Sequence, residues 1–245
     1  MNPERLDLLG LPLDPVTMDG AVAWVRDRLG EGGQVVTLNP EIIVQARTNP
    51  ALARAIREAE LVTPDGVGVL WAVRRLYGRE LPERVTGVDL TVRLFEELGG
   101  ELRVFFLGGR PGVAERAAAA ARERYGVGLA GHAHGYFDED EEAALVERVR
   151  ASGGNLLLAG LGPRQEVFLH RHKDHLGGAV GIGVGGTLDV LAGEAQRAPA
   201  WARRLGVEWL LRVGLDPKRW PRAGRLVRFA WWVEREARHL PRQKT

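Results

Sequence analysis

The feature of this sequence that most limits its fold is the alternation of short apolar runs with longer segments of helical periodicity. Four runs bounded by glycine, proline or asparagine predict buried strands, at Gln34–Leu38, Leu102–Leu107, Asn155–Ala159 and Ala179–Ile182. Helical patterns separate and flank them, at Glu41–Arg47, Val67–Leu76, Val88–Leu98, Val113–Arg124, Glu139–Arg150 and Arg164–His175. Such alternation predicts an α/β fold with a Rossmann-like parallel sheet and helices on both of its faces.

Composition excludes several classes of protein. The chain contains no cysteine, which excludes a disulfide framework, a thiol nucleophile, a zinc ribbon and an iron–sulfur cluster. No segment resembles a signal peptide, and no apolar run approaches the ~20 residues of a membrane span. We therefore expect the chain to work in the cytoplasm.

The charge is distributed unevenly along the chain. Residues 196–245 hold 13 Lys and Arg against 4 Asp and Glu, whereas residues 1–195 hold 21 against 28. Five of the seven tryptophans also lie in this last part, at Trp201, Trp209, Trp220, Trp231 and Trp232. Because strand signals stop near Ala195–Pro199, we predict a catalytic domain at 1–195 and a helical, basic C-terminal appendage at 196–245. The appendage is expected to meet an anionic partner, and a solvated helical cap is the alternative.

The end of the appendage has the pattern of an amphipathic basic helix. Apolar residues recur at helical spacing, at Leu226, Phe229, Ala230, Val233, Ala237 and Leu240, and arginines can occupy another face, at Arg225, Arg228, Arg235, Arg238 and Arg242. Together with Trp231 and Trp232, this pattern suits an anionic membrane surface. Alternatively, the apolar stripe packs on the body of the protein, and both interpretations can hold at once.

Glycine-rich segments follow the predicted strands, where ligands of parallel sheets bind. Gly108–Gly112 comes after a strand and opens a helix, with Pro111 expected in the first helical turn, and Gly181–Asp189 has the same character. Backbone amides and a helix N-terminus in such a loop suit a phosphate group, although a plain tight turn has the same pattern. Two such loops favour a nucleotide or another phosphorylated ligand.

Acidic residues and histidines offer candidate chemistry that is ambiguous from pattern alone. Asp65, in Thr63-Pro-Asp65-Gly66, suits either a general base or a helix cap. Asp138-Glu-Asp140 has a spacing that can hold a divalent metal, but it precedes helix formers and is expected to cap a helix. The histidines His132, His134, His170, His172 and His175 are expected to be surface or packing residues. We therefore expect no metal and no cofactor.

These segments together resemble the WecG/TagA/CpsF family of bacterial glycosyltransferases. The matching motifs are ordered along most of the chain. They are Thr37-Leu-Asn39-Pro-Glu, Pro64-Asp65-Gly66, Arg84-Val-Thr-Gly87-Val-Asp89, Gly108-Gly109-Arg-Pro-Gly112, Gly135-Tyr136-Phe137, Gly160-Leu-Gly-Pro-Arg-Gln165-Glu166, Gly183-Val-Gly-Gly-Thr-Leu-Asp189, Arg197-Ala-Pro-Ala-Trp201 and Glu208-Trp-Leu-Leu-Arg212.

The resemblance implies a reaction and a set of site residues. It implies transfer of N-acetylmannosamine from a UDP-sugar donor to a polyprenol-diphosphate-linked GlcNAc acceptor, with inversion and without a metal, at the inner face of the cell membrane. Asp65 would be the general base, and Thr37, Asn39, Arg84 and Gln165 would line the sugar. By the same resemblance, further residues would hold the nucleotide (Gly108, Gly109, Gly112, Tyr136 and Asp189) or a diphosphate (Arg212, Arg219 and Arg222). Related enzymes use a UDP-N-acetylmannosaminuronic acid donor or act in capsule assembly, so the donor stays open.

Two other functional classes fit the sequence less well. A nucleotide-linked oxidoreductase should have a Gly-x-Gly-x-x-Gly turn with an acidic residue about 20 positions later, and the first glycine loop lacks that turn. A nucleic-acid-binding protein would explain the basic end but not the acidic body, and we expect no nucleic acid partner. The sequence leaves a homo-oligomer open.

Overall fold

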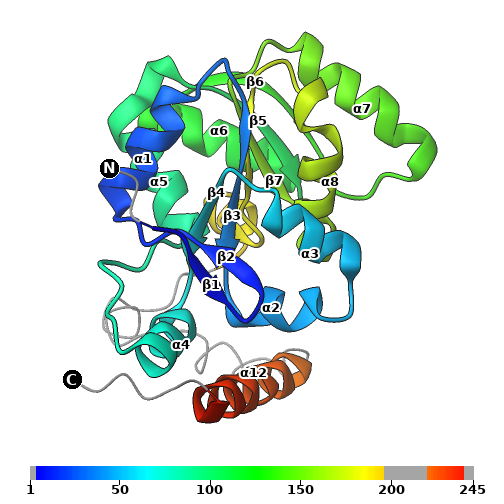
Figure 1. The fold of residues 1–245 in the computed structure, drawn as a ribbon. Coiled ribbons are helices and arrows are strands. Elements are labelled where there is room, and N and C mark those ends of the chain that lie inside the picture. Colours follow the sequence, from blue (N-terminus) through cyan, green and yellow to red (C-terminus); the bar gives the residue numbers. More distant parts are fainter. Residues whose placement is uncertain (1–3, 196–219, 240–245) are drawn as a thin grey trace.

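A six-stranded, fully parallel sheet forms the centre of the protein (Figure 1). The computed structural model describes residues 4–195 and 220–239. The strand order is β4-β3-β8-β7-β5-β6. The strands are β3 (Gly33–Leu38), β4 (Leu61–Pro64), β5 (Arg103–Gly108), β6 (Gly128–Ala133), β7 (Leu156–Gly160) and β8 (Val180–Gly183). A small antiparallel hairpin, β1 (Leu6–Leu8) and β2 (Leu11–Leu13), lies beside the sheet.

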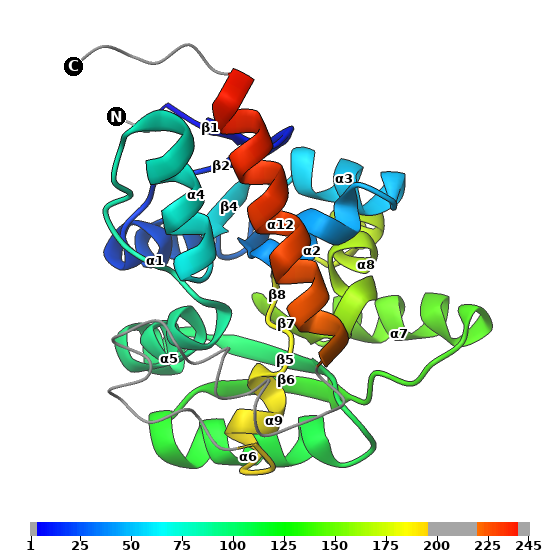
Figure 2. The ribbon, with the colours of Figure 1, turned by 90° about the horizontal axis from the view of Figure 1, so that it is seen from below.

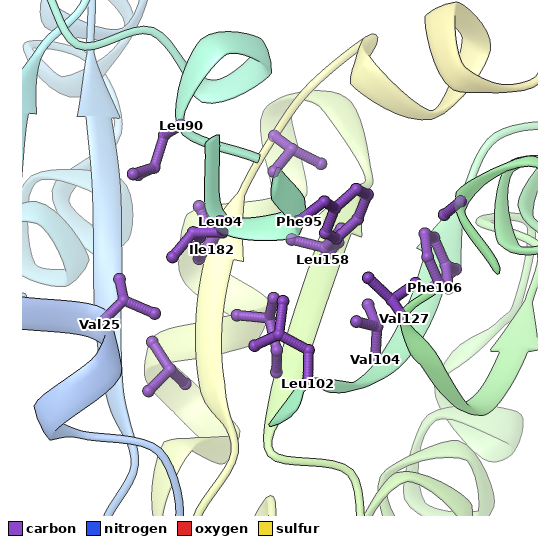
Figure 3. Close-up of a cluster of buried hydrophobic side chains, with 14 of the residues drawn as sticks. Val25, Leu90, Leu94, Phe95, Leu102, Val104, Phe106, Val127, Leu158 and Ile182 are labelled. Atoms are coloured by element: carbon purple, nitrogen blue, oxygen red, sulfur yellow. The ribbon is translucent and has the colours of Figure 1, made fainter. Parts of the chain in front are cut away.

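Helices cover both faces of this sheet, as the sequence predicts. One face packs against α1 (Met18–Asp27), α5 (Gly87–Leu98) and α6 (Val113–Tyr125), and Figure 3 shows part of that buried cluster. The other face packs against α2 (Pro40–Ala46), α3 (Pro50–Arg57), α4 (Val67–Tyr77), α7 (Glu139–Ala151) and α8 (Gln165–His172). A short helix, α9 (Thr187–Leu191), follows β8. The Rossmann-like α/β prediction is therefore confirmed.

The predicted elements agree with the observed ones except where the apolar signal is short or mixed. The four predicted strands are present with ends shifted by one residue. Strands β4 and β6 lie at the two edges of the sheet, and β6 is half-exposed and lacks an apolar run; neither is among the four predicted strands. The single helix predicted over 164–175 is wrong, because 3₁₀ turns at Gly162–Arg164 and Lys173–His175 flank the shorter α8.

A long C-terminal helix, α12 (Trp220–His239), packs against α2 and α4 (Figure 2). Phe229 and Val233 are buried in the same cluster as the inner faces of α2 and α4. Arg225 Nη2 lies 2.6 Å from Glu41 Oε1 in α2, which adds an ion pair to this contact. The interpretation that the apolar stripe packs on the body is therefore confirmed.

The outer face of α12 is exposed. Val227 is 71% exposed and Trp231 is 57% exposed, while Trp232 packs partly into the core with Arg47 over its ring. Only one of the two adjacent tryptophans is therefore placed to meet a surface, which corrects the pairing of Trp231 with Trp232 in the sequence prediction. None of the described helices is long and apolar enough to cross a membrane.

The β4 edge of the sheet is closed by one aspartate rather than by another strand of the sheet. The Asp14 backbone N–H donates to Val62 O at 2.8 Å, and Asp14 Oδ2 accepts from Val62 N at 2.7 Å. Arg5 holds the same carboxylate through two bonds of 2.8 Å. Asp14 therefore satisfies backbone groups that an edge strand would otherwise leave open.

We predict that Asp14→Ala lowers the free energy of unfolding by about 2 kcal/mol, because it leaves the buried Val62 N–H without its side-chain acceptor. Chemical denaturation monitored by circular dichroism measures the change. The matched control is Asp19→Ala, whose side chain is 81% exposed and pairs only with Arg93 among the described residues. This control is expected to stay within about 0.5 kcal/mol of wild type. Equal stability of the two variants would contradict the role of Asp14.

Candidate functional site

All six carboxyl ends of the parallel strands meet at one edge of the sheet, and most of the predicted site residues lie there. Asn39 follows β3 and Asp65 follows β4, and the last residues of these strands, Leu38 and Pro64, are paired. The Asp65 backbone N–H donates to Leu38 O at 2.9 Å. The half-buried Asp65 and Asn39 are therefore held at neighbouring strand ends.

Thr37, near the end of β3, and the loop before α5 lie at the same edge. The buried Thr37 hydroxyl donates to Gly183 O at 3.2 Å, which ties β3 to β8. A Cβ added at Gly87, the first residue of α5, would lie only 3.5 Å from Thr37 Oγ1. Arg84 precedes that helix, and its Nη2 lies 4.0 Å from Asp89 Oδ2. The Arg84–Asp89 loop is thereby brought to the carboxyl end of β3.

Gln165, at the start of α8, reaches the end of β8. Its Oε1 accepts from the Gly185 N–H at 3.0 Å, and its Nε2 donates to Glu166 Oε1 at 2.7 Å. Both side chains are buried, with Gln165 4% and Glu166 1% exposed. The Gln165 amide is therefore fixed from both of its ends.

The Gly108–Gly112 loop passes very close to its neighbours. Gly108 has a φ of +142°, and a Cβ there would lie 2.4 Å from Gly160 O, so only glycine fits. Gly109 N donates to Gly160 O at 3.3 Å, and Gly135 N donates to Gly109 O at 2.9 Å. The loops after β5, β6 and β7 thus pack backbone to backbone. Tyr136, which follows Gly135, is 69% exposed beside them.

The sequence predicted Pro111 in the first turn of the following helix, and this prediction is wrong. Helix α6 begins at Val113, and Gly112 is its N-cap with a left-handed φ of +86°. Pro111 lies before that cap. The glycine makes the turn into the helix, because a left-handed backbone favours a residue without a side chain.

Helix N-termini at this edge differ in how they are capped. Helices α4, α6 and α9 have glycine N-caps, at Gly66, Gly112 and Gly186, with no side-chain hydrogen bond. Helices α1, α3, α5 and α7 are capped by side chains, at Thr17, Asn49, Thr86 and Asp138. The glycine-capped helices present first-turn N–H groups and the positive end of the helix dipole, which suits an anion. Asp189 lies in the first turn of α9.

Asn39 has a structural task in addition to the predicted one. It is the N-cap of α2, and its Oδ1 accepts from Ile42 N at 3.0 Å. Its Nδ2 is then the side-chain group left to donate to a ligand. Binding by Asn39 remains a prediction.

Asp138 and two of the histidines, His170 and His172, make contacts within the protein. Asp138 forms a capping box with Glu141 at the start of α7, as the sequence predicts. His170 pairs with Glu58 at 3.0 Å and His172 pairs with Glu142 at 2.7 Å. Across residues 4–195 and 220–239, no three His, Asp or Glu side chains are grouped as metal ligands would be.

Of the predicted arginines, Arg212 and Arg219 lie outside the described residues. Arg222 lies in α12, ahead of the described side chains. Arg225, one turn further along, bonds Glu41 in the first turn of α2. Helix α12 also contacts the first turn of α4. Phe229 Cε1 lies 3.7 Å from the position that a Cβ on Gly68 would take. The N-terminal half of α12 therefore lies beside the strand ends that carry Asn39 and Asp65.

Two residues near the edge had no assigned role in the sequence analysis. The Arg116 guanidinium packs on the glycine loop, because its Nη1 lies 2.6 Å from the position of a Cβ on Gly112, and it also pairs with Glu194. Glu166 belongs to the Gly160–Glu166 motif, but the motif alone does not show that its carboxyl group is buried and has a shifted pKa. Burial raises the pKa of the Glu166 carboxyl to about 7, against the opposing effect of its bond from Gln165.

A family model of glycosyl transferases matches this chain. The model is that of the Glycosyl transferase WecG/TagA/CpsF family, and it matches residues 6–243, which is nearly the whole chain. The match includes the sheet, the glycine loops and α12.

The burial of Glu166 predicts a stability that depends on pH. Its pKa is about 7 in the folded protein, against 4.5 as its ordinary value, so the folded state holds a proton more tightly. The resulting stabilisation is present below pH 4.5 and is lost as the pH rises through 7, a change of about 3 kcal/mol.

We therefore expect Glu166→Gln to remove this decline, because glutamine does not titrate. The free energy of unfolding, measured by denaturation from pH 5 to pH 8, should decline less steeply in the variant than in wild type. The exposed Glu123→Gln is the control, and its curve should parallel that of wild type. Parallel curves for wild type and Glu166→Gln would contradict the prediction.

Proposed function

Because the chain belongs to the WecG/TagA/CpsF family of glycosyl transferases, we propose that it transfers N-acetylmannosamine from UDP-N-acetylmannosamine to a GlcNAc-diphospho-polyprenol. In this reaction the acceptor hydroxyl oxygen forms a bond to the anomeric carbon of the donor sugar. The bond from that carbon to UDP breaks on the opposite side, which inverts the anomeric centre. The product would serve teichoic acid or a related surface glycan.

The observation that carries this proposal is the pairing of a carboxylate with glycine-capped helix N-termini along one sheet edge. An inverting displacement needs one base for the acceptor hydroxyl and stabilisation of the leaving diphosphate. Asp65 follows β4 and immediately precedes Gly66, the N-cap of α4. Helices α9 and α6 follow β8 and β5, and β8 lies midway between β4 and β5 in the strand order.

Asp65 acts as the general base. Its carboxylate takes the proton of the acceptor hydroxyl as that oxygen attacks. The bond from Asp65 N to Leu38 O keeps the residue at the end of β4, which supports a defined position for the carboxylate. Precise placement of the reacting groups lowers the barrier because little motion is left to restrict.

Thr37, Arg84 and Gln165 position the sugars around the reacting atoms. Thr37 and Gln165 converge on the end of β8 through Gly183 and Gly185, which supports a shared site. Arg84 brings a positive charge to the same strand ends. The Asn39 Nδ2 group donates to a sugar oxygen beside them.

The nucleotide occupies the part of this edge that is formed by the loops after β5, β6 and β8. The loop formed by Gly108, Gly109 and Gly112 holds the diphosphate at the N-terminus of α6. Tyr136 stacks on the base, and Asp189 accepts hydrogen bonds from the nucleoside. Arg116 adds positive charge next to Gly112.

The appendage, residues 196–245, completes the acceptor side. Arg212, Arg219 and Arg222 engage a diphosphate, a task that suits arginine because it stays charged and binds phosphate with two donors. These cations take the part that a divalent metal plays in other transferases, so turnover is proposed to be independent of metal. The contact of α12 with the first turns of α2 and α4 supports this placement.

The protein works at the inner face of the cell membrane and is held there by one exposed face. Trp231 and Val227 on α12 and Trp71 on α4 are exposed, and Arg235 lies over the Trp231 ring. Trp71 packs edge-on against the buried Phe229, so it lies where α4 meets α12. Interfacial tryptophans and arginines together suit an anionic lipid surface.

Release of UDP tests the reaction. Purified protein receives UDP-N-acetylmannosamine and a short-chain GlcNAc-diphospho-lipid in the presence of EDTA. Acceptor-dependent UDP release is the expected result. Turnover only with the uronic acid donor would overturn the donor and keep the reaction class, and loss of turnover with EDTA would overturn metal independence.

We predict that Asp65→Asn lowers kcat by about 10²–10⁴-fold, because asparagine cannot accept the proton. Affinity for UDP-N-acetylmannosamine, measured by calorimetry, should change less than threefold since the side chain keeps its size. The control is Asp19→Asn on the exposed start of α1. Wild-type turnover by Asp65→Asn would remove this residue from its proposed role.

We predict that the double variant Trp71→Ser, Trp231→Ser binds vesicles of anionic lipid about tenfold more weakly, which corresponds to about 1.4 kcal/mol of lost apolar burial. Vesicle sedimentation measures the binding. Leu129→Ser is the matched control, because Leu129 is 37% exposed but lies on β6 at the opposite edge of the sheet. Equal losses in the two proteins would contradict the assignment of this face.

A further inference from the structure

We propose that Glu166 is a positioning residue for the transfer reaction, and that its carboxylate fixes the amide of Gln165 so that one N–H of that amide faces the substrate. This inference rests on the proposed function, because it takes Gln165 to contact the sugar. Glu166 itself contacts neither substrate.

The two contacts of the Gln165 amide define a single orientation. A backbone N–H only donates, so the bond of 3.0 Å from Gly185 N fixes the oxygen end of the amide. The other end of the amide is therefore Nε2, which donates to Glu166 Oε1 at 2.7 Å. Nε2 has two hydrogens, and among the described residues only Glu166 accepts one of them. The other hydrogen is left for a ligand.

The pair can reach the end of β8 because the last residue of that strand, Gly183, has no side chain. A Cβ on Gly183 would lie 2.8 Å from Gln165 Nε2 and 2.9 Å from Glu166 Oε1, closer than such contacts allow. Gly183 O is also the acceptor of the Thr37 hydroxyl. The Gln165–Glu166 pair therefore lies against the same residue that orients Thr37.

Glu166 is held in place by its backbone as well. The buried Gln34 side chain on β3 donates from Nε2 to Glu166 O at 3.0 Å. This bond joins the first turn of α8 to the sheet. The Glu166 backbone therefore cannot move away from β3 without breaking a buried hydrogen bond.

The arrangement costs folding free energy, which argues against a purely structural role. Of the described lysines, arginines and histidines, none pairs with Glu166, although the side chain is only 1% exposed. A buried carboxyl group without a cation is unfavourable for stability. Perturbed groups of this kind gather at functional sites, and here the group borders one.

A double-mutant cycle tests the proposal through activity. Glu166→Met keeps a similar length but removes the acceptor, and it is expected to lower kcat about 10–100-fold, as Gln165→Ala does. The double variant should be no slower than Gln165→Ala, because Glu166 acts only through Gln165. Glu166→Gln keeps an acceptor oxygen and should restore most of kcat. If the double variant instead lost kcat by the product of the two single-variant losses, the proposal would be overturned.

Hydrogen exchange at the Gly185 amide tests the same contact without activity. The Gln165 oxygen protects that N–H, so Glu166→Met should raise its exchange rate about tenfold while Glu166→Gln should not. Phe168→Leu is the matched control, because Phe168 is buried on the same helix but packs against Phe137 and His172. An unchanged Gly185 exchange rate in Glu166→Met would overturn the proposal.

These two measurements separate this inference from the proposed function. If wild-type protein transfers sugar but Gln165→Ala is equally fast, the positioning role is overturned and the reaction stands. If wild-type protein transfers neither donor sugar, the proposed function fails, and Gly185 exchange alone decides whether Glu166 holds Gln165.

Discussion

Parallel pairing of all six strands is the constraint on which the rest of this structure depends. It forces every strand to end at one edge, so that short polar and glycine-containing loops converge there from residues far apart in sequence. It also forces each connection to cross the sheet through a helix, which places helix N-termini at the same edge. Packing at this edge is so close that neither Gly108, against the Gly160 backbone, nor Gly183, against the Gln165 and Glu166 side chains, leaves room for a side chain. The close packing explains why a glycine-rich edge can still hold side chains in defined positions.

The fold could be predicted from the sequence because its central strands are buried on both faces. Strands β3, β5, β7 and β8 are mostly apolar and almost entirely buried, a signal that does not depend on which strand lies beside which. Strands β4 and β6 lie at the two edges of the sheet and have weaker signals. The order of the strands is a long-range property, since it depends on which helix packs on which face, and local pattern carries no information on it.

The site could be predicted from the sequence as a set of motifs, but not as a set of contacts. Motifs identified Asp65, Thr37 and Gln165, and the parallel sheet explains why they lie at one edge. The pairing of Arg116 with Glu194 and the burial of Glu166 depend on residues that are distant in sequence. Pro111 was predicted in the first turn of α6 but lies just before its N-cap, because a left-handed glycine begins the helix. Local rules fail where the backbone takes an uncommon conformation.

The diameter of helix α12 sets the distance between its exposed outer face and the strand ends behind its inner face. Helix α12 has 20 residues, with one face against the first turns of α2 and α4 and the opposite face bearing Trp231. A surface that touches the outer face lies about one helix diameter, ~10 Å, from the strand ends behind the inner face. Under the proposed function, a lipid-linked acceptor bound there would have to raise its sugar by about that distance above the surface. The helix would thus act as a spacer that favours acceptors whose reactive group stands clear of the lipid.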